Sequence, residues 1–299
     1  MKDVFEISGI SKQGFHQMLK RRHICQEKRE QLLPIIHRFR KDHPRMSARD
    51  MYLVLRPQGI GRDQFEQFCF SNGFRVKRLI NYRVTTNSYG VTRFPNLIRD
   101  KKLTGINQIF VSDITYFEIG PKCYYITLIM DLYNREIVGW SASKNLRTEN
   151  TTIPALYQLY QTRGRNNIKG AIFHSDGGGQ YYCKEFLALT KDILTNSMTE
   201  EDVLENSHAE RLNGTIKNNY LYPYNPKDLS SLIKMLNKAV FMYNNGKPHC
   251  ALGKQTPISY LMPTVDNENN SKASYFPLST VNHVHTINKL ISNKKVNVI

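Results

Sequence analysis

Paired cysteines and long hydrophobic runs are both missing from this sequence of 299 residues. Its five cysteines are scattered and never form a Cys-x-x-Cys pair, which argues against a disulfide framework or a zinc ribbon. His16, His23 and Cys25 lie near one another, but the spacing and the fourth ligand of a structural zinc site are missing. The longest apolar run, around Tyr124 to Met130, is too short to span a bilayer. The N-terminus does not have the pattern of a secretory signal, so we expect a cytoplasmic protein with no membrane segment.

Acidic residues are scarce relative to basic ones. The chain has 42 Lys and Arg against 25 Asp and Glu, which gives a net charge of +17. A protein this basic usually binds a polyanion. The charge is also uneven, because residues 1–100 hold 20 Lys and Arg against 9 Asp and Glu, or +11 of the total. A surface that only aids solubility needs no such asymmetry, so the composition favours nucleic-acid binding.

The pattern of the sequence divides the chain into four regions. Residues 1–80 have the apolar spacing of short helices, whereas residues 81–104 are basic and lack sustained periodicity, as is typical of a linker. Residues 105–262 have the pattern of an α/β domain. Residues 263–299 form a polar and basic tail whose role stays open.

The apolar spacing in residues 1–80 predicts several helices, the last two of which have the outline of a helix-turn-helix unit. Ser11 is a candidate N-cap for one helix, and residues 27–40 carry apolar side chains at the spacing of another. Ser47 precedes a third helical stretch, a turn with Pro and Gly interrupts it, and helical spacing resumes over residues 62–71. An ordinary three-helix domain is the alternative. In a helix-turn-helix unit, the last helix would offer to a DNA major groove the side chains of Arg62, Gln64 and Gln67.

From residue 107 the pattern becomes one of strands and then helices. Residues 109–117, 124–130 and 136–141 are rich in β-branched and aromatic side chains, and their closeness in sequence predicts an antiparallel meander. A helix, a buried strand and three helices are then predicted at residues 149–160, 168–174, 181–192, 203–220 and 228–244. This order predicts an α/β layered domain with a mixed sheet.

Two aspartates are associated with predicted strands. Asp113 lies within an apolar strand, where a carboxylate must be paired, hydrogen-bonded or bound to a cation. Asp176 ends another strand and precedes glycines 177–179, which allow a ligand to come close. The glycines lack the spacing and the Lys-Ser/Thr of a phosphate-binding loop, so ATP binding is not predicted. For Asp113 taken alone, an Asp at a strand edge or in a cap remains the alternative.

Glu210 is the third candidate carboxylate. At 100° per residue it shares one flank of its predicted helix with Asn206, Asn213 and Lys217, beside the apolar stripe. A solvated helix face would look the same. With the two aspartates, however, Glu210 would complete an oxygen-only site for Mg²⁺ or Mn²⁺. Two such ions, about 4 Å apart, would activate the attacking oxygen and stabilise the leaving oxygen of a phosphoryl displacement.

Two further polar residues lie close to these positions in the sequence. Asp131 is a fourth acidic candidate, which we interpret as a turn residue between two strands. For His174 two interpretations stay open. It either tunes Asp176 or contacts substrate, or it is a packed histidine with satisfied hydrogen bonds.

Five motifs follow one another in the second domain. They are Asp113-Ile114-Thr115-Tyr116, Asp131 to Trp140, His174-Ser175-Asp176, Asn206 to Lys217, and Tyr243-Asn244 with Lys247-Pro248-His249. In these motifs the chain resembles the insertion-sequence transposases of the OrfB (IS-three) type, a branch of the retroviral-integrase superfamily. The spacing of 34 residues between Asp176 and Glu210 is close to that family's D-D-E pattern.

The resemblance implies a fold and a function. The expected fold is a ribonuclease-H-like mixed-sheet core preceded by a helical region, and the expected activity is metal-dependent cleavage and strand transfer of an insertion sequence. Asp113, Asp176 and Glu210 would be both catalytic and metal-binding, and Lys217 would contact DNA. The implied partners are double-stranded DNA, further copies of the chain, and an upstream helix-turn-helix protein or fusion.

The chain departs from the family pattern at two places. Asn206 stands where many relatives have Asp, and Thr199-Glu200-Glu201-Asp202 replaces a more basic loop that carries Gly. These departures keep two alternatives open. One is a non-catalytic DNA-binding remnant of an element, and the other is a ribonuclease-H-like nuclease that cuts without joining.

Overall fold

The structure is a computed structural model that describes residues 11–76, 94–99, 101–199 and 206–262. The predicted tail, residues 263–299, lies outside the described residues, as does most of the predicted linker. Its described parts, residues 94–99 and 101–104, contain no helix or strand. None of the helices in these ranges is long and apolar enough to cross a membrane.

A five-stranded mixed sheet forms the centre of the second region. The antiparallel meander predicted from the sequence is confirmed by strands β1 (Ile109–Ile119), β2 (Lys122–Asp131) and β3 (Ile137–Ser143). Strand β4 (Ala171–Ser175) pairs parallel to β1, and β5 (Leu194–Met198) pairs parallel to β4. The strand order is therefore β3-β2-β1-β4-β5, with β1 in the middle.

The fifth strand is missing from the order that the sequence predicts. Its residues are Leu-Thr-Asn-Ser-Met, so only its two ends are apolar. A strand this short and polar shows no clear alternation of apolar and polar positions. What holds β5 at the edge of the sheet is backbone pairing with β4, from Ala171 opposite Leu194 to Ser175 opposite Met198. Such pairing depends on the neighbouring strand and cannot be seen in the segment's own composition.

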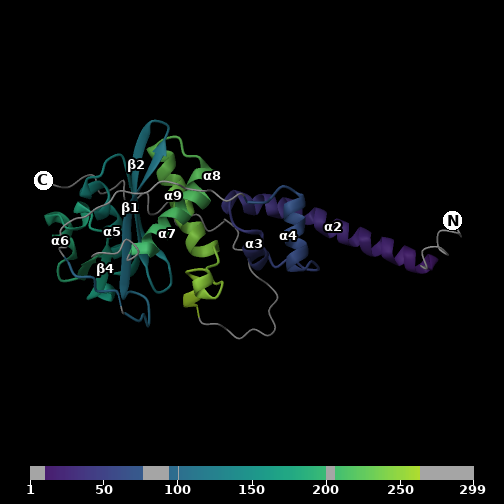
Figure 1. Cartoon of the computed structure of the whole chain (residues 1–299), viewed down its shortest axis with the longest axis horizontal. Coiled ribbons are helices and arrows are strands. Elements are labelled where there is room, and N and C mark those ends of the chain that lie inside the picture. Colours follow the sequence, from purple (N-terminus) through teal and green to yellow (C-terminus); the bar gives the residue numbers. More distant parts are fainter. Residues whose placement is uncertain (1–10, 77–93, 100, 200–205, 263–299) are drawn as a thin grey trace.

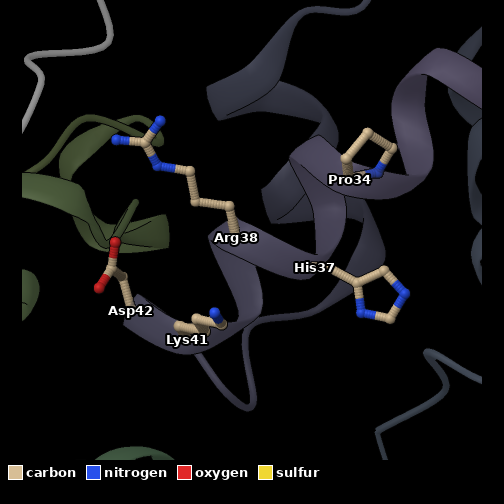
Figure 2. Close-up of a pocket in the computed structure, with 5 residues that line it drawn as sticks. All are labelled: Pro34, His37, Arg38, Lys41 and Asp42. Atoms are coloured by element: carbon tan, nitrogen blue, oxygen red, sulfur yellow. The ribbon is translucent and has the colours of Figure 1, made fainter.

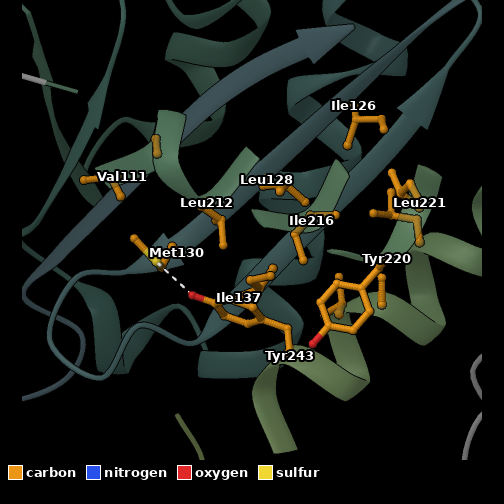
Figure 3. Packing of buried hydrophobic residues seen from close by; sticks show 14 of the residues in the cluster. Val111, Ile126, Leu128, Met130, Ile137, Leu212, Ile216, Tyr220, Leu221 and Tyr243 are labelled. Carbon is orange, nitrogen blue, oxygen red and sulfur yellow. Dashed lines mark hydrogen bonds between the residues drawn. The ribbon is translucent and has the colours of Figure 1, made fainter. Parts of the chain in front are cut away.

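Helices cover both faces of the sheet (Figure 1). The helices α5 (Thr152–Arg163) and α6 (Lys184–Thr190) pack on the face that carries Phe110 and Ile129. The opposite face is covered by α7 (Ser207–Ile216) and α9 (Leu229–Gly246), joined by a π-helical turn (Lys217–Leu221) and α8 (Tyr222–Tyr224). Figure 3 shows this second layer, with Val111, Leu128 and Met130 of the strands beside Leu212 and Ile216 of α7. Successive strand residues thus alternate between two apolar cores.

The N-terminal region contains one long helix where the sequence predicts two short ones. Helix α2 (Lys12–Asp42) runs without a break, and Ser11 caps it as predicted, accepting from the amide of Gly14 at 3.1 Å. The prediction of two helices is wrong because residues 20–26 are mostly polar and interrupt the apolar spacing. They contain no Pro or Gly, so nothing in the backbone ends the helix there.

The two helices of the predicted helix-turn-helix outline are confirmed. Ser47 caps α3 (Ala48–Leu55) by accepting from the amide of Asp50 at 3.0 Å, and α4 (Arg62–Ser71) follows a turn in which Gly59 has a φ of 76°. These helices pack against the C-terminal part of α2. The shared core consists of Ile36, Phe39, Met46, Ala48, Met51, Phe65 and Cys69.

The helical region contacts the sheet domain where α2 ends. Asp42 forms an ion pair of 2.9 Å with Lys238 of α9, and its carbonyl accepts from the hydroxyl of Tyr224 at 2.8 Å. The buried His43 ring approaches the Tyr220 hydroxyl at 3.4 Å. Beside this joint, an open hollow of about 600 Å³ is lined by Pro34, His37, Arg38, Lys41 and Asp42 (Figure 2). We call the contacts of Asp42 and His43 with the sheet domain the α2 joint.

Candidate active site at three carboxylates

The pairing of β1 with β4 places two of the predicted carboxylates side by side. These strands run parallel, and their register ends with Ser112 opposite Ser175. Asp113 and Asp176 are the next residues on their respective strands, so they leave the paired segment at the same level. Neighbouring strands lie about 4.8 Å apart, and equivalent positions of parallel strands point to the same face. The two aspartates therefore meet although 63 residues separate them in the sequence.

Electrostatics give independent support for this proximity. Burial, followed by the charge of Asp176, raises the pKa of Asp113 to about 7. The pKa of Asp176 is raised as well, by burial first and by the charge of Glu210, although the amide of Gly178 donates to it and opposes the rise. The charge of Glu210 also raises the pKa of Asp113. All three carboxylates thus lie within each other's electric field.

Helix α7 lies against β1 through the flank predicted from the sequence. Asn206 donates to the carbonyl of Ser112 at 3.2 Å, and Asn213 donates to Oδ2 of Asp113 at 2.8 Å. One turn further on, Lys217 donates to the hydroxyl of Thr115 at 2.7 Å. Glu210 lies between these residues on the same flank and is exposed. Its charge raises the pKa of both Asp113 and Asp176, so its carboxylate lies near theirs.

A hydrogen bond between Tyr181 and Ser112, which the sequence did not predict, lies next to Asp113. The buried Tyr181 hydroxyl shares a 2.9 Å hydrogen bond with Ser112, next to Asp113. Burial and the charges of Asp176 and Asp113 keep the pKa of Tyr181 well above its ordinary value, so it stays protonated. No sequence signal connects Tyr181 to Ser112, because the contact depends on how the segment after β4 folds back.

The donor set determines what the site can bind. Asp113, Asp176 and Glu210 offer only oxygens, which suits a hard divalent cation such as Mg²⁺ or Mn²⁺. Within the described ranges no three His, Cys, Asp or Glu side chains are already grouped closely enough to hold a metal ion. Glu210 is the exposed member of the three, and rotation of its side chain is the smallest change that would complete the group.

Asp131 and His174 belong to the scaffold around the site. Asp131 ends β2 and accepts from the amides of Asn107 at 2.7 Å and Tyr133 at 3.0 Å, which confirms that it is a turn residue. His174 is fully buried in β4 and shares a 2.9 Å hydrogen bond with Ser197 of β5. Of the two interpretations of His174, the structure therefore favours the packed histidine.

The predicted DNA-contacting residues lie in two places. Arg62, Gln64 and Gln67 are exposed on α4, in the helical region and away from the carboxylates, and Arg62 forms a 2.8 Å ion pair with Asp63. Lys217 instead lies next to the carboxylates. Burial lowers its pKa, whereas the charge of Asp113 raises it. The structure thus brings Lys217 to the candidate site and leaves the α4 residues on a separate surface.

Known proteins are similar to this chain over much of its length. Two family models, both described as an integrase core domain, match residues 104–196 and 195–257, just over half of the chain. An uncharacterized 31 kDa protein of insertion element IS600 from Shigella sonnei is 25% identical over 264 residues, which are 85% of this chain and 96% of that protein. The InsK protein of insertion sequence element IS150 from Escherichia coli (strain K12) is 29% identical over 62% of this chain and 64% of its own length. The InsF transposase of insertion sequence IS3A from the same strain is 28% identical over 42% of this chain and 44% of its own length.

Two solved viral structures are partly similar to this chain. The HTLV-2 integrase catalytic core domain in complex with magnesium is 22% identical, with a TM-score of 0.40 over 51% of this chain and 94% of that one. A chain of the simian T-cell lymphotropic virus intasome is 18% identical, with a TM-score of 0.44 over 75% of this chain and 74% of that one.

The mixed sheet and the matches to residues 104–257 define the class of the second domain, which is an integrase core with a ribonuclease-H-like fold. Outside this core, the chain is similar to proteins of bacterial insertion sequences, to the extent given above.

Proposed function

We propose that this protein cleaves DNA and joins the ends of an insertion sequence to target DNA, at a site formed by Asp113, Asp176 and Glu210. The observation that carries the proposal is the register of β1 and β4, which aligns Asp113 with Asp176 under the flank of α7 that holds Glu210. Mg²⁺ or Mn²⁺, two ions by the chemistry of phosphoryl transfer, would be bound by these three side chains. Bound ions would supply Lewis-acid activation of the attacking oxygen and stabilisation of the leaving one.

The other residues of the site would position these carboxylates. The amide of Asn213 donates to Oδ2 of Asp113 and would fix the plane of the carboxylate. Asn206 and Lys217 attach α7 to β1 on either side of Glu210. A substrate phosphate at the site could compete with Thr115 for the ammonium of Lys217, and this is the role we propose for that lysine.

DNA is the proposed partner along both regions of the chain. The net charge of +17 favours the phosphate backbone, and Arg62, Gln64 and Gln67 are the side chains of α4 that we propose to contact bases or phosphates. Strand transfer joins element ends to a target, so we also propose that copies of the chain act together on DNA, with an upstream helix-turn-helix protein or fusion as a further partner. The proposed place of action is the nucleoid in the bacterial cytoplasm.

The decisive experiment replaces one carboxylate at a time. Asp113→Asn, Asp176→Asn and Glu210→Gln should each lower metal-dependent strand transfer by at least about 100-fold, while salt-sensitive DNA binding changes little. Asp192→Asn is the matched control, because Asp192 is exposed and away from α7. Strand transfer that persists in Asp176→Asn would contradict the proposed site.

Analysis of the reaction products separates this function from the alternatives. Joined donor and target DNA with Mg²⁺ or Mn²⁺ is the expected result. Cut but unjoined DNA would identify a nuclease, and DNA binding without any metal-dependent nicking would identify a non-catalytic remnant.

A further inference from the structure

Helix α7 has a second polar flank, opposite the one that carries Glu210. His208 and Arg211 lie three residues apart and are therefore neighbours on the helix surface. His208 is separated from Glu210 by two residues, or about 200° around the helix. This flank faces the turn between β2 and β3, where the side chain of Arg135 meets it.

Arg135 has an unusual backbone that directs its side chain to α7. Its φ is 63°, in the left-handed region that non-glycine residues rarely occupy. The turn is closed by a 2.9 Å hydrogen bond from the amide of Arg135 to the carbonyl of Asp131. From there the guanidinium reaches Nδ1 of His208 at 3.0 Å. Backbone strain of this kind is retained where the position of a side chain matters.

The contact between Arg135 and His208 joins two basic groups. Since a guanidinium can only donate, Nδ1 of His208 must accept, and the ring is neutral with its proton on Nε2. The pKa of His208 is lowered to about 4, by burial first and then by the charges of Arg135 and Arg211. Burial also lowers the pKa of Arg135 and the charge of Arg211 adds to this effect, whereas the charges of Tyr243 and Asp131 oppose it.

The carboxylates nearest in sequence do not neutralise this cluster. Asp131 accepts from the amides of Asn107 and Tyr133, and Glu136 forms an ion pair with Arg163. Across the ranges that the structure describes, neither Arg135 nor Arg211 forms an ion pair with a carboxylate. Two guanidiniums and a histidine ring therefore lie on this flank of α7 close enough to affect one another's charge, and the flank has an excess of positive charge. An anion with several oxygens would satisfy all three groups.

We propose that Arg135, His208 and Arg211 bind one phosphate of the DNA backbone on the flank of α7 opposite Glu210. This proposal rests on the proposed function, because DNA is the polyanion that the active site would bring to α7. A helix is about 10 Å across, so this phosphate belongs to a different nucleotide from the one that reacts. The cluster therefore holds the DNA on the far side of the helix that carries the catalytic glutamate, and it is a binding site without a catalytic role.

The test measures DNA affinity as a function of salt for Arg211→Gln, whose exposed side chain is dispensable for folding. Loss of one phosphate contact should reduce the slope of log K against log salt by about 0.9 and weaken binding at low salt severalfold. Arg135→Lys should show a similar but smaller weakening, because a lysine keeps the charge and loses the two-pronged geometry. The matched control is Arg165→Gln, an exposed arginine at the end of α5 that lies over the Tyr160 ring.

The outcomes separate this proposal from the function on which it rests. If the wild type binds and joins DNA while Arg211→Gln keeps the slope of the Arg165→Gln control, the phosphate site is wrong and the proposed function stands. If the variants lose affinity for polyglutamate but not for DNA, the cluster binds an acidic peptide and the proposal is overturned. Absence of salt-dependent DNA binding in the wild type would overturn both the phosphate site and the proposed function.

Discussion

Asp113 is the residue at which the requirements of folding and of the proposed metal binding conflict most clearly. It lies in the central strand of the sheet, in contact with Asn213 and within the electric field of two other carboxylates. Its folded-state pKa of about 7 lies above its ordinary value of 3.8. The folded protein therefore holds more protons than the unfolded chain between about pH 4 and pH 7, and its free energy of unfolding falls as pH rises through that window.

The first prediction follows from this sign. In the presence of a chelator, the free energy of unfolding of the wild type should fall between pH 5 and pH 8. In Asp113→Asn this fall should be smaller by about 1 to 3 kcal/mol, since each pKa unit corresponds to about 1.4 kcal/mol. The measurement is urea denaturation at both pH values. Asp192→Asn serves as the control and should follow the wild type. Identical pH dependence in Asp113→Asn and wild type would show that Asp113 is not buried with a raised pKa.

The acidic residues of the site were predictable from the sequence, but the groups that support them were not. Asp113 and Asp176 stand out because they lie in an apolar strand and before a glycine run, whereas Glu210 stands out by its spacing of 34 residues from Asp176, which resembles the family's D-D-E pattern. The hydrogen bond from Asn213 to Asp113 joins residues 100 positions apart, and its existence depends on how α7 approaches β1. Composition and periodicity describe one segment at a time and do not contain that information.

At the scale of elements, the close packing of β3 against α5 depends on one glycine. A Cβ added at Gly139 would collide with the backbone carbonyl of Ala155 and would lie 3.2 Å from Cδ1 of Ile129. Neither a helix backbone nor a buried side chain can move freely in a packed core. The helix can lie this close to the sheet only because position 139 has no side chain.

We therefore expect Gly139→Ala to lower the free energy of unfolding by about 1 to 3 kcal/mol. Gly105→Ala is the matched control, because a Cβ at that position meets nothing within 4 Å. It should change stability by less than about 0.5 kcal/mol in the same urea titration. Equal stability of the two variants would mean that α5 is packed less closely on β3 than described.

Elements were predictable where local signals are strong. Ser11, Ser47 and Asp228 cap the helices that follow them, and each such cap can be seen in the sequence. Strand β5 and the continuity of α2 were not predictable, since the first depends on pairing with β4 and the second on a mostly polar segment, residues 20–26, that remains helical. Helix α7 likewise ends in a π-helical turn at Lys217–Leu221, for which the sequence has no marker.

At the scale of the whole molecule, the α2 joint connects the helical region to the sheet domain. The carboxylate of Asp42 is almost buried and is paired with the ammonium of Lys238. Removing Lys238 would leave that carboxylate largely unpaired. The Lys238 side chain is itself 39% exposed, so solvent would compensate part of the loss.

Lys238→Ala should lower stability by about 1 to 2 kcal/mol and separate the unfolding of the helical region from that of the sheet domain. Calorimetry would then show a broader transition or two transitions. Lys234→Ala, an exposed lysine one turn earlier on α9, should leave the transition unchanged. A Lys238→Ala transition that matches this control would mean that the ion pair does not contribute to the joint.

The helical region also makes a prediction about DNA recognition. If α4 reads a major groove, Gln64→Ala and Gln67→Ala should reduce discrimination between cognate and altered element ends by about 1 to 3 kcal/mol. Arg62→Ala should instead weaken binding to all sequences. Competition binding with both DNAs measures the two effects, and Gln161→Ala, on α5, is the control. Unchanged discrimination in both glutamine variants would leave α4 without a role in reading sequence.

The helix that carries Glu210 also completes the larger apolar core. Leu212 and Ile216 of α7 and Leu232 and Leu236 of α9 cover strand residues that would otherwise face water, and all of them follow the last strand in the chain. A ribosome therefore makes strands β1 to β5 before it makes Glu210 or the helices α7 and α9 that cover this core. Prematurely terminated chains that end before α7 would expose a broad apolar surface and be removed by proteases. Few such chains would therefore persist to compete with the full-length protein for the DNA ends that we propose it binds.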